Sequence, residues 1–331
     1  AEFGGAHAER RALEAAGDAA DGATVYVNLE PCAHHGKTPP CADALVRAGV
    51  SRVVIGCEDP DPEADGGLET LREAGVAVEV GVERVAALRL NAPFVWRHRR
   101  DRPFVTLKLA LSLDGRIAAG PGQRTEVTGD EAWEHVHGLR AVHDAVAVGR
   151  RTVEIDDPRL TARGDPAPRR PPVRVVLATR PRLPEGAGLA GPSAEPPVWV
   201  VAAAGEEADT TSPGPRVLEA APAEEGPGVD PADALRRLGR QGVGTVLLEG
   251  GGRVAASFLR AGVVERMHLI YAPRVFGSRG VEGFPGAPPA TGEWRTVERR
   301  PLGGDTLLVL ESPGLTSLLA AEAGEAGTGG G

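Results

Sequence analysis

The first 41 residues hold one imidazole, two thiols and one carboxylate in a pattern that suits zinc chemistry. His7 is followed two positions later by Glu9, and Cys32 and Cys41 come next in a chain with only three cysteines. A catalytic zinc ion takes three protein ligands of these types and leaves one position for water, whose pKa it lowers to about 7. We therefore predict His7, Cys32 and Cys41 as metal ligands. Glu9 is the predicted catalytic residue, which moves a proton from that water to a departing amine.

Three interpretations of this cluster compete. Nucleobase deaminases use this donor set and proton carrier, which favours a zinc hydrolytic deaminase. A buried cysteine pair beside a surface histidine is the plain alternative, and the combination of His-x-Glu, Pro-Cys and a further Cys disfavours it. A structural zinc module would need a fourth protein ligand, for which His34 or His35 is available. Cys57 follows a predicted strand and is expected in the core.

The elements that must position these residues alternate between strands and short helices. Alternation of this kind favours βαβ units and a largely parallel sheet covered by helices. Thr38-Pro39-Pro40 opens the second helix, with Thr38 as its N-cap. Helices are predicted at 7–16, 38–48, 66–75 and 83–100, and strands at 24–29, 51–56 and 76–82.

A second α/β region follows a charged boundary between Arg99 and Pro103. We place the domain junction there, with residues 1–100 as the first domain and 101–312 as the second. Residues 204–230 are predicted to be a surface loop, and residues 313–331 a disordered tail. Strands are predicted at 104–111, 144–149, 173–178, 198–203, 245–250, 266–272 and 306–310, and helices near 130–140, 231–240 and 252–261.

A run of glycines in the second region suits phosphate binding. A predicted strand runs into Glu249-Gly250-Gly251-Gly252, and a helix follows. Glycines let a backbone approach a phosphate closely, and a helix N-terminus offers unpaired N–H groups. The run does not match GxGxxG, so a Rossmann domain is not indicated, and a tight strand-to-helix turn is the alternative.

Composition narrows the classes of function. The net charge is −9 without a pronounced basic patch, which argues against a nucleic-acid partner. No apolar run approaches the roughly 20 residues that span a bilayer, and no signal peptide is evident. Three cysteines make no disulfide framework, so a cytoplasmic location is expected.

The segment Glu30–Cys41, EPCAHHGKTPPC, closely resembles the deaminase of riboflavin biosynthesis. Further along, KLALSLDG (108–115), TVEIDDPRLTAR (152–163) and LEGGGRVAAS (248–257) extend the resemblance to the bifunctional deaminase–reductase family. It implies an α/β protein with an N-terminal cytidine-deaminase-like domain, truncated at its start, and a dihydrofolate-reductase-like domain. The implied cofactors are Zn2+ and NADPH, the partners are phosphorylated pyrimidine nucleotides, and homo-oligomers occur in the family.

The resemblance also implies functions for individual residues. His34, His35 and Lys37 could contact substrate, and Lys108 is expected to position it. Bidentate guanidinium binding suits Arg140 and Arg163 to phosphate. Substrate-facing residues would be Lys108, Arg140, Leu160, Arg163 and Glu249. Residues lining the NADPH site would be Ala110, Thr152, Asp156, Thr179, Gly251, Gly252, Arg253, Val254, Ala255, Ala256 and Ser257.

Two departures from the family pattern bear on activity. Glu126 stands where the family usually has an aromatic residue near the cofactor, which replaces a stacking surface with a charge. The family's deaminase half normally begins well before His-x-Glu, so we expect zinc ligands to be present but turnover to be poor. Asp114 is either a site residue or the turn residue of Asp-Gly.

The function that follows is a two-step conversion in riboflavin biosynthesis. The first step is zinc-dependent hydrolytic deamination of 2,5-diamino-6-(5-phosphoribosylamino)pyrimidin-4-one. The second is NADPH reduction of the ribosyl group of 5-amino-6-(5-phosphoribosylamino)uracil to ribityl. The alternatives are a reductase with a structural or inactive zinc module, and a tRNA or free-base deaminase. The latter would show a basic face and Cys-x-x-Cys, and the chain has neither.

Overall fold

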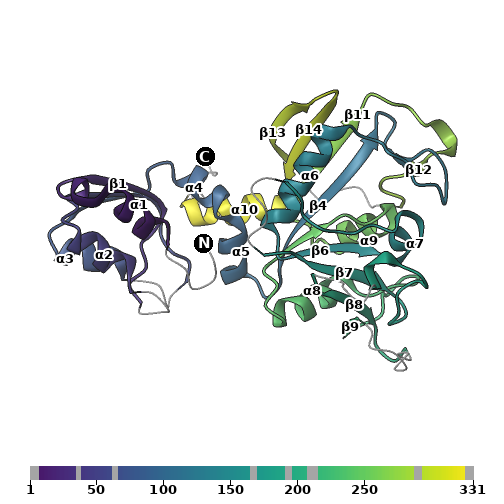
Figure 1. The fold of residues 1–331 in the computed structure, drawn as a ribbon, viewed down its shortest axis with the longest axis horizontal. Coiled ribbons are helices and arrows are strands. Elements are labelled where there is room, and N and C mark those ends of the chain that lie inside the picture. Colours follow the sequence, from purple (N-terminus) through teal and green to yellow (C-terminus); the bar gives the residue numbers. More distant parts are fainter. Residues whose placement is uncertain are drawn as a thin grey trace, which may run out of the picture. The chain divides into compact units, whose positions relative to one another are not determined.

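The chain forms two compact units, which are described separately. The computed structural model describes residues 7–34, 39–61, 66–164, 170–190, 196–206, 215–286 and 293–324. The first unit comprises residues 1–100 and 317–331, and the second residues 101–316. Figure 1 labels many of their helices and strands.

The first unit is built on a small parallel sheet in the order β1-β2-β3. Its strands are β1 (Thr24–Leu29), β2 (Arg52–Cys57) and β3 (Ala77–Val80). Their helices are α1 (Ala8–Ala16), α2 (Cys41–Arg47), α3 (Gly67–Glu73), α4 (Arg84–Leu90) and α5 (Ala92–Arg99), and η1 (Gly17–Ala20) is a 3-10 turn.

A small apolar core holds the first sheet to its helices. Leu45 of α2 and Leu71 of α3 are fully buried against Val53 and Ile55 of β2. Leu13 of α1 packs against the same cluster. This packing brings the start of α1 and the start of α2 to the same region as the end of β1.

The second unit contains a nine-stranded sheet in the order β13-β14-β11-β4-β10-β6-β7-β8-β9. The seven strands from β11 to β9 are parallel. At one edge, β14 pairs antiparallel with β11, and β13 pairs antiparallel with β14. Its strands are β4 (Phe104–Ser112), β6 (Ala145–Gly149), β7 (Val173–Ala178), β8 (Val198–Ala203), β9 (Arg216–Ala220), β10 (Thr245–Leu248), β11 (Arg266–Ala272), β13 (Arg295–Leu302) and β14 (Asp305–Glu311), and β5 (Arg116–Ala118) pairs separately with β12 (Val281–Glu282).

Helices cover both faces of this sheet. Helices α8 (Pro231–Arg240) and α9 (Gly252–Arg260) bury apolar residues against one face, where Leu107 and Leu109 of β4 point. Helices α6 (Asp130–Val142) and α7 (Arg150–Asp156) cover the other face. Short 3-10 turns occur at η2 (Gly188–Ala190) and η3 (Gly277–Arg279).

The face under α6 carries two apolar clusters with a polar gap between them. Ala132 and Val136 of α6 pack on Ile270 of β11. Leu139, further along the helix, packs on a cluster centred on β6 and β7. Side chains alternate between the two faces of a strand, so Thr106 and Lys108 of β4 lie on the α6 face, between the clusters.

Four sequence predictions of local structure need correction. Residues 204–230 are not all loop, because β9 adds an exposed edge strand there. The predicted tail 313–331 begins with a helix, α10 (Pro313–Ala323), while residues 325–331 lie outside the described part. The connecting helix 83–100 is two helices that meet at Asn91, before the Pro in the first turn of α5. Thr38, the predicted N-cap, lies outside the described residues, and α2 begins at Cys41 with Pro40 as its N-cap residue.

Docking of α10 explains why the last segment is ordered. Within the first unit, Arg84 donates from Nε and Nη2 to the carbonyl oxygen of Glu322, at 3.1 and 2.9 Å. The guanidinium of Arg99 binds the Glu322 carboxylate at 2.6 and 3.2 Å. These bonds satisfy a carbonyl at the C-terminal end of the helix, which would otherwise lack a partner. In the described ranges, no helix combines the length and apolar character needed to cross a membrane.

Candidate functional site

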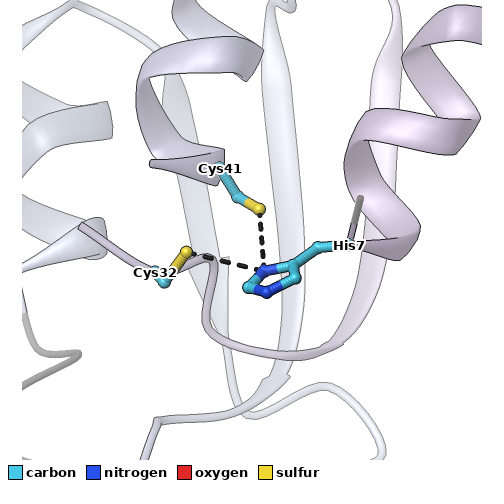
Figure 2. Close-up of side chains that lie close together, drawn as sticks. All are labelled: His7, Cys32 and Cys41. Atoms are coloured by element: carbon cyan, nitrogen blue, oxygen red, sulfur yellow. Dashed lines mark hydrogen bonds between the residues drawn. The ribbon is translucent and has the colours of Figure 1, made fainter. Parts of the chain in front are cut away.

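The predicted zinc ligands converge in the first unit. The Nδ1 atom of His7 lies 3.3 Å from Sγ of Cys41 and 3.7 Å from Sγ of Cys32, and Figure 2 shows both thiols directed at the imidazole. All three donor atoms lie within 4.8 Å of one another. Tetrahedral zinc with Zn–N near 2.1 Å and Zn–S near 2.3 Å separates such ligand atoms by about 3.6 Å. The donor set and its spacing therefore fit a zinc ion.

Three elements bring these donors together. His7 is the N-cap residue of α1, Cys41 is the first residue of α2, and Cys32 lies in the loop after β1. The N–H of Ala42 donates to the carbonyl of Cys32 at 3.2 Å, which fixes the loop to the start of α2. Positive charge at a helix N-terminus favours thiolate.

The buried carboxylate of Glu30 braces the loop that carries Cys32. It accepts hydrogen bonds from the N–H groups of Asp59, at 3.3 Å, and Leu68, at 2.9 Å. A side chain at Gly67 would collide with the carbonyl oxygen of Pro31, so glycine lets α3 approach this loop closely. The loop is therefore held from two sides before any metal binds.

The two cysteine thiols shift each other's pKa in opposite directions. The hydrogen bond from Cys41 outweighs burial and lowers the pKa of Cys32 to about 5, with help from the Cys41 N–H and from His7. The same bond, with burial, raises the pKa of Cys41. A cation bound to both sulfurs would favour their thiolate forms and release protons. Glu9 also raises the pKa of Cys41 by its charge and by a hydrogen bond, so its carboxylate lies beside the donors.

The remaining predictions for the first unit concern further metal ligands, substrate contacts and the third cysteine. Within the described residues, the metal-capable group is limited to His7, Cys32 and Cys41, and His34 does not join it. His35 and Lys37 lie outside the described residues. Cys57 is buried and its thiol donates to the carbonyl of Asn28 at 3.2 Å, which agrees with the predicted core position.

In the second unit, three of the predicted substrate residues, Lys108, Arg140 and Glu249, lie together under α6. Arg140 of α6 and Glu249, which follows β10, form two charge-assisted hydrogen bonds of 2.6 and 2.7 Å. The third guanidinium nitrogen of Arg140 donates to the carbonyl of Thr161 at 3.1 Å. Burial alone would raise the pKa of Glu249, but the Arg140 guanidinium outweighs it and holds that pKa below its ordinary value. Arg140 thus binds Glu249 and the loop through one N–H of each of its three nitrogens.

Lys108 lies beside this pair on β4. Burial lowers the pKa of its ammonium, although the charge of Glu249 works in the opposite direction. Its Nζ atom is 5.6 Å from the ring centre of Trp133 on α6, and it makes no hydrogen bond to a described residue. Trp133 is 38% exposed, a large apolar ring next to a charged group. The two side chains together present an aromatic ring and a positive charge next to each other.

The loop after α7 carries the other predicted substrate residues. Leu160 is buried with φ of 53°, and Asp157 has φ of 40°, so two non-glycine residues adopt the left-handed conformation in one loop. Arg163 is exposed, and its N–H donates to Nδ1 of His137 at 3.3 Å. With the bond from Arg140 to Thr161, this bond fixes the loop to α6.

The glycine run forms the turn from β10 into α9, with Gly251 as N-cap residue. A side chain at Gly252 would meet the carbonyl oxygen of Glu282 at 2.3 Å, so that glycine is needed for chain packing. A Cβ on Gly251 would lie 3.6 Å from Oγ1 of Thr152, which places a predicted cofactor residue beside the turn. The N-terminus of α9 and Thr152 therefore share one location.

The remaining predicted cofactor residues are spread over several elements. Ala255 and Ala256 are buried, Ala255 within the apolar core of the large sheet, and the Ser257 hydroxyl donates to the carbonyl of Val254 at 2.9 Å. Burial raises the pKa of Asp156 at the end of α7. Ala110 lies on β4, Thr179 directly follows β7 and Arg253 is in the first turn of α9.

Glu126 and Asp114 occupy different settings. The Glu126 side chain is 75% exposed, so its charge faces solvent. Asp114 accepts hydrogen bonds from Ser112 at 2.6 Å and from the N–H groups of Phe276 and Gly277 at 3.1 and 2.7 Å. These bonds lower the pKa of Asp114 to about 2. Asp114 joins two loops, which supports the turn interpretation.

Sequence reasoning missed three histidines and a tryptophan on the α6 face. His135 of α6 is hydrogen-bonded to His268 of β11, and His143 to Thr106 of β4. The sequence separates His135 from His268 by 133 positions, so no local motif relates them. Strand alternation could have placed His268 on the same face as Lys108, had the register been known.

Each of the two units matches a known protein family. Residues 3–57 match the family described as "Cytidine and deoxycytidylate deaminase zinc-binding region", and residues 103–308 match "RibD C-terminal domain". The two matched stretches contain the converging donors and the polar group under α6.

Proteins that are similar to most of this chain belong to the same family. The chain is 38% identical over 281 residues to riboflavin biosynthesis protein RibD of Bacillus amyloliquefaciens, covering 83% of this chain and 74% of the relative. It resembles the solved RibD structure of Acinetobacter baumannii with a TM-score of 0.79, at 35% identity and with 93% and 86% of the two chains covered. A Thermotoga maritima structure, described as a diaminohydroxyphosphoribosylaminopyrimidine deaminase/5-amino-6-(5-phosphoribosylamino)uracil reductase, matches with a TM-score of 0.76 at 33% identity, covering 94% and 86%.

Proposed function

The chain belongs to the RibD family of riboflavin biosynthesis proteins. On this basis we propose which of its residues act in each of that family's two reactions. The chain is a bifunctional enzyme with a zinc-dependent deaminase unit and an NADPH-dependent reductase unit. The first unit has a cytidine-deaminase-like fold and the second a dihydrofolate-reductase-like fold. The substrates are 2,5-diamino-6-(5-phosphoribosylamino)pyrimidin-4-one for the deaminase and 5-amino-6-(5-phosphoribosylamino)uracil for the reductase.

In the deaminase unit, His7, Cys32 and Cys41 hold zinc. When bound, zinc lowers the pKa of water and supplies a nucleophile at neutral pH. Glu9 takes a proton from the attacking water and delivers it to the amino nitrogen on C2, which leaves as ammonia, while the water oxygen stays on C2. The observation that carries this assignment is the convergence of three donors beside the Glu9 carboxylate.

In the reductase unit, the substrate lies under α6. NADPH supplies the hydride when bound. The reduction adds that hydride to C1′ of the ribosyl group, breaks the bond from C1′ to the ring oxygen and places one proton on that oxygen. Lys108 and Glu249 orient the ribosyl group, and the exposed guanidinium of Arg163 binds the phosphate. Arg140 positions Glu249, to which it donates two hydrogen bonds.

The cofactor site is assigned to the turn before α9. N–H groups at the start of this helix would bind the phosphates of NADPH, and Thr152 lies beside them. Ala110, Asp156 and Thr179 complete the site on neighbouring elements. Homo-oligomer formation and a cytoplasmic location, without nucleic-acid partners, are part of the same proposal.

Substitution of Glu9 tests the deaminase assignment. Glu9→Gln should keep one zinc per chain and lose ammonia release by a factor on the order of 10² to 10⁴. Glu14→Gln is the matched control, since Glu14 is an exposed carboxylate on the same helix. Metal analysis together with ammonia release measures both effects. Full turnover by Glu9→Gln would refute the role of Glu9.

Arg163→Gln tests the phosphate assignment in the reductase. Loss of a bidentate phosphate contact should raise the KM for the nucleotide about tenfold or more and leave the KM for NADPH unchanged. Arg151→Gln, at an exposed position on α7, is the control. Equal KM values for the two variants would place the phosphate elsewhere.

A further inference from the structure

The two hydrogen-bonded histidines under α6 form a chain that ends beside Lys108. Nε2 of His135 lies 3.0 Å from Nδ1 of His268, and the two rings stack with centres 5.2 Å apart. On its other side, Nδ1 of His135 lies 3.2 Å from Nη2 of Arg300 on β13. His268 is buried and His135 is half-buried.

These contacts determine where each imidazole carries its proton. A guanidinium can only donate, so Nδ1 of His135 accepts from Arg300. The proton of His135 is then on Nε2, which donates to Nδ1 of His268. His268 is therefore neutral with its proton on Nε2. Burial, with His135 and Arg266 nearby, lowers the pKa of His268 to about 3, which agrees with a neutral ring.

The Nε2–H group of His268 is left over as a donor. Among the described residues, none accepts a hydrogen bond from it. His143, on the same sheet face, differs: its Nδ1 is 2.7 Å from the carbonyl of Leu139, and its Nε2 is 2.9 Å from Oγ1 of Thr106. Both nitrogens of His143 are used within the chain, whereas one nitrogen of His268 is available to a ligand.

The position of His268 relates it to the substrate site. His268 pairs with Lys108 in the register of β11 with β4, so the two side chains lie next to each other on the α6 face. Glu249 follows β10 on the other side of β4. Neighbouring strands are about 4.8 Å apart, and β4 lies between β10 and β11. The backbones at Glu249 and His268 are therefore about 10 Å apart.

The substrate has the same linear order as these side chains. Its phosphate, ribosyl group and pyrimidine follow one another, as do Arg163, then Glu249 with Lys108, then His268. Trp133, half exposed beside Lys108, offers a ring on which a pyrimidine can stack at this end. With the ribosyl group at Glu249 and Lys108, the base lies over β11.

We propose that His268 donates a hydrogen bond from Nε2 to the oxygen on C2 of the pyrimidine, and so selects the deaminated nucleotide over its diamino precursor. The proposal rests on the proposed function, because it uses the substrate orientation given above. The two nucleotides differ at C2, which carries an amino group before deamination and an oxygen after it. A donor whose tautomer is fixed matches the oxygen and opposes the amino group. The reductase unit thereby recognises the atom that the deaminase unit installs.

A proton relay through the same residues is disfavoured by the geometry. A relay would require His135 to receive a proton at Nδ1, where Arg300 already donates, and a guanidinium does not release a proton in proteins. The chain of contacts thus holds one tautomer rather than passing protons.

The test compares reduction of the two nucleotides by the full chain. Every variant also carries Glu9→Gln, so that the diamino nucleotide is not deaminated, and ammonia release is measured in the same samples to confirm this. His268→Phe keeps a flat ring and removes the donor, whereas His268→Gln keeps an N–H donor. His143→Phe is the matched control, and thermal melting together with NADPH binding reports on folding. The measured quantity is the ratio of kcat/KM for the deaminated over the diamino nucleotide.

We expect the ratio to fall about tenfold or more in His268→Phe, mainly through the deaminated nucleotide, to recover largely in His268→Gln and to stay unchanged in His143→Phe. Long-range 1H–15N NMR should show the Nε2–H tautomer of His268. If His268→Phe does not fold, Arg300→Gln on the exposed β13 carries the test, with a mixture of tautomers and a lower ratio expected. An unchanged ratio in the folded variants would overturn the proposal. Absence of NADPH oxidation with either nucleotide in the Glu9→Gln parent would instead refute the proposed reductase function.

Discussion

The two sites of this chain differ in how their polar groups are satisfied. In the first unit, two thiols and an imidazole face one another with their donor atoms within 4.8 Å, so the donors are arranged for a cation. In the second unit, Arg140 and Glu249 already neutralise each other, and Arg140 also holds a loop carbonyl. The first site is completed by its metal, while the second is preorganised by its own charges. Removing a group should therefore affect metal binding in the first unit and folding in the second.

The largest effect is expected from the zinc ligands. Cys41→Ala should abolish stoichiometric zinc and lower ammonia release by a factor on the order of 10³ or more, because water then keeps its ordinary pKa. Reduction of the deaminated nucleotide should continue. Metal analysis with both activity assays measures this, and Cys57→Ala is the control, a buried thiol that is not a donor. Zinc retained by Cys41→Ala would contradict the ligand assignment.

The buried ion pair comes next. Glu249→Gln leaves the Arg140 charge buried without its partner, which should cost about 3 kcal/mol in the free energy of unfolding, and reductase activity should be lost. Deaminase activity should remain. Denaturant unfolding followed by tryptophan fluorescence reports the first effect. A loss of activity without a loss of stability would mean that Glu249 acts on substrate alone.

A pH dependence of stability is expected from His268. Its folded pKa, about 3, lies below the ordinary value near 6.5, so unfolding takes up a proton when the pH is below 6.5. Stability contributed by the neutral ring is therefore lost as the pH falls from about 6.5 towards 3. The difference in unfolding free energy between the natural chain and His268→Phe should change by about 1.4 kcal/mol per pH unit in that window. Parallel curves for the two proteins would show that His268 keeps an ordinary pKa.

The smallest effect is expected at an exposed pair. Arg150 and Glu154 of α7 lie 2.8 Å apart at i,i+4, with both side chains partly exposed. Glu154→Gln should cost only about 0.3–0.5 kcal/mol, because water screens the pair. Unfolding of this variant calibrates the Glu249→Gln result. A cost equal to that of Glu249→Gln would remove the distinction between a buried and an exposed pair.

The contrast between the units also explains what could be predicted from sequence. The zinc donors lie within 35 residues, at the starts of α1 and α2 and in the loop after β1, so their spacing was enough to propose the site. The central strands of the large sheet are continuous apolar runs, and β7, β8 and β11 were predicted at their observed bounds. The predicted fold class, cofactors and bifunctional activity are confirmed by the family matches.

The elements and residue pairs that were not predicted from sequence depend on tertiary structure. Strands β9 and β13 are mostly exposed, and the charged sequence of β13 lacks the alternation that marks a half-buried strand. The end of α10 is held by Arg84 and Arg99 from more than 200 positions away. The pairing of Arg140 with Glu249, and of His135 with His268, follows from strand order across the sheet, which local patterns do not reveal.

One measurement tests the central claim that a single chain carries out both reactions in order. The full chain, loaded with zinc, is incubated with the diamino nucleotide and NADPH, and ammonia release and NADPH absorbance are followed in the same sample. We predict one ammonia followed by one NADPH oxidised per nucleotide. In Glu9→Gln we predict no ammonia and only a residual rate of NADPH oxidation from the diamino nucleotide. Equally fast NADPH oxidation in Glu9→Gln and in the natural chain, or release of ammonia with no later oxidation, would contradict the claim.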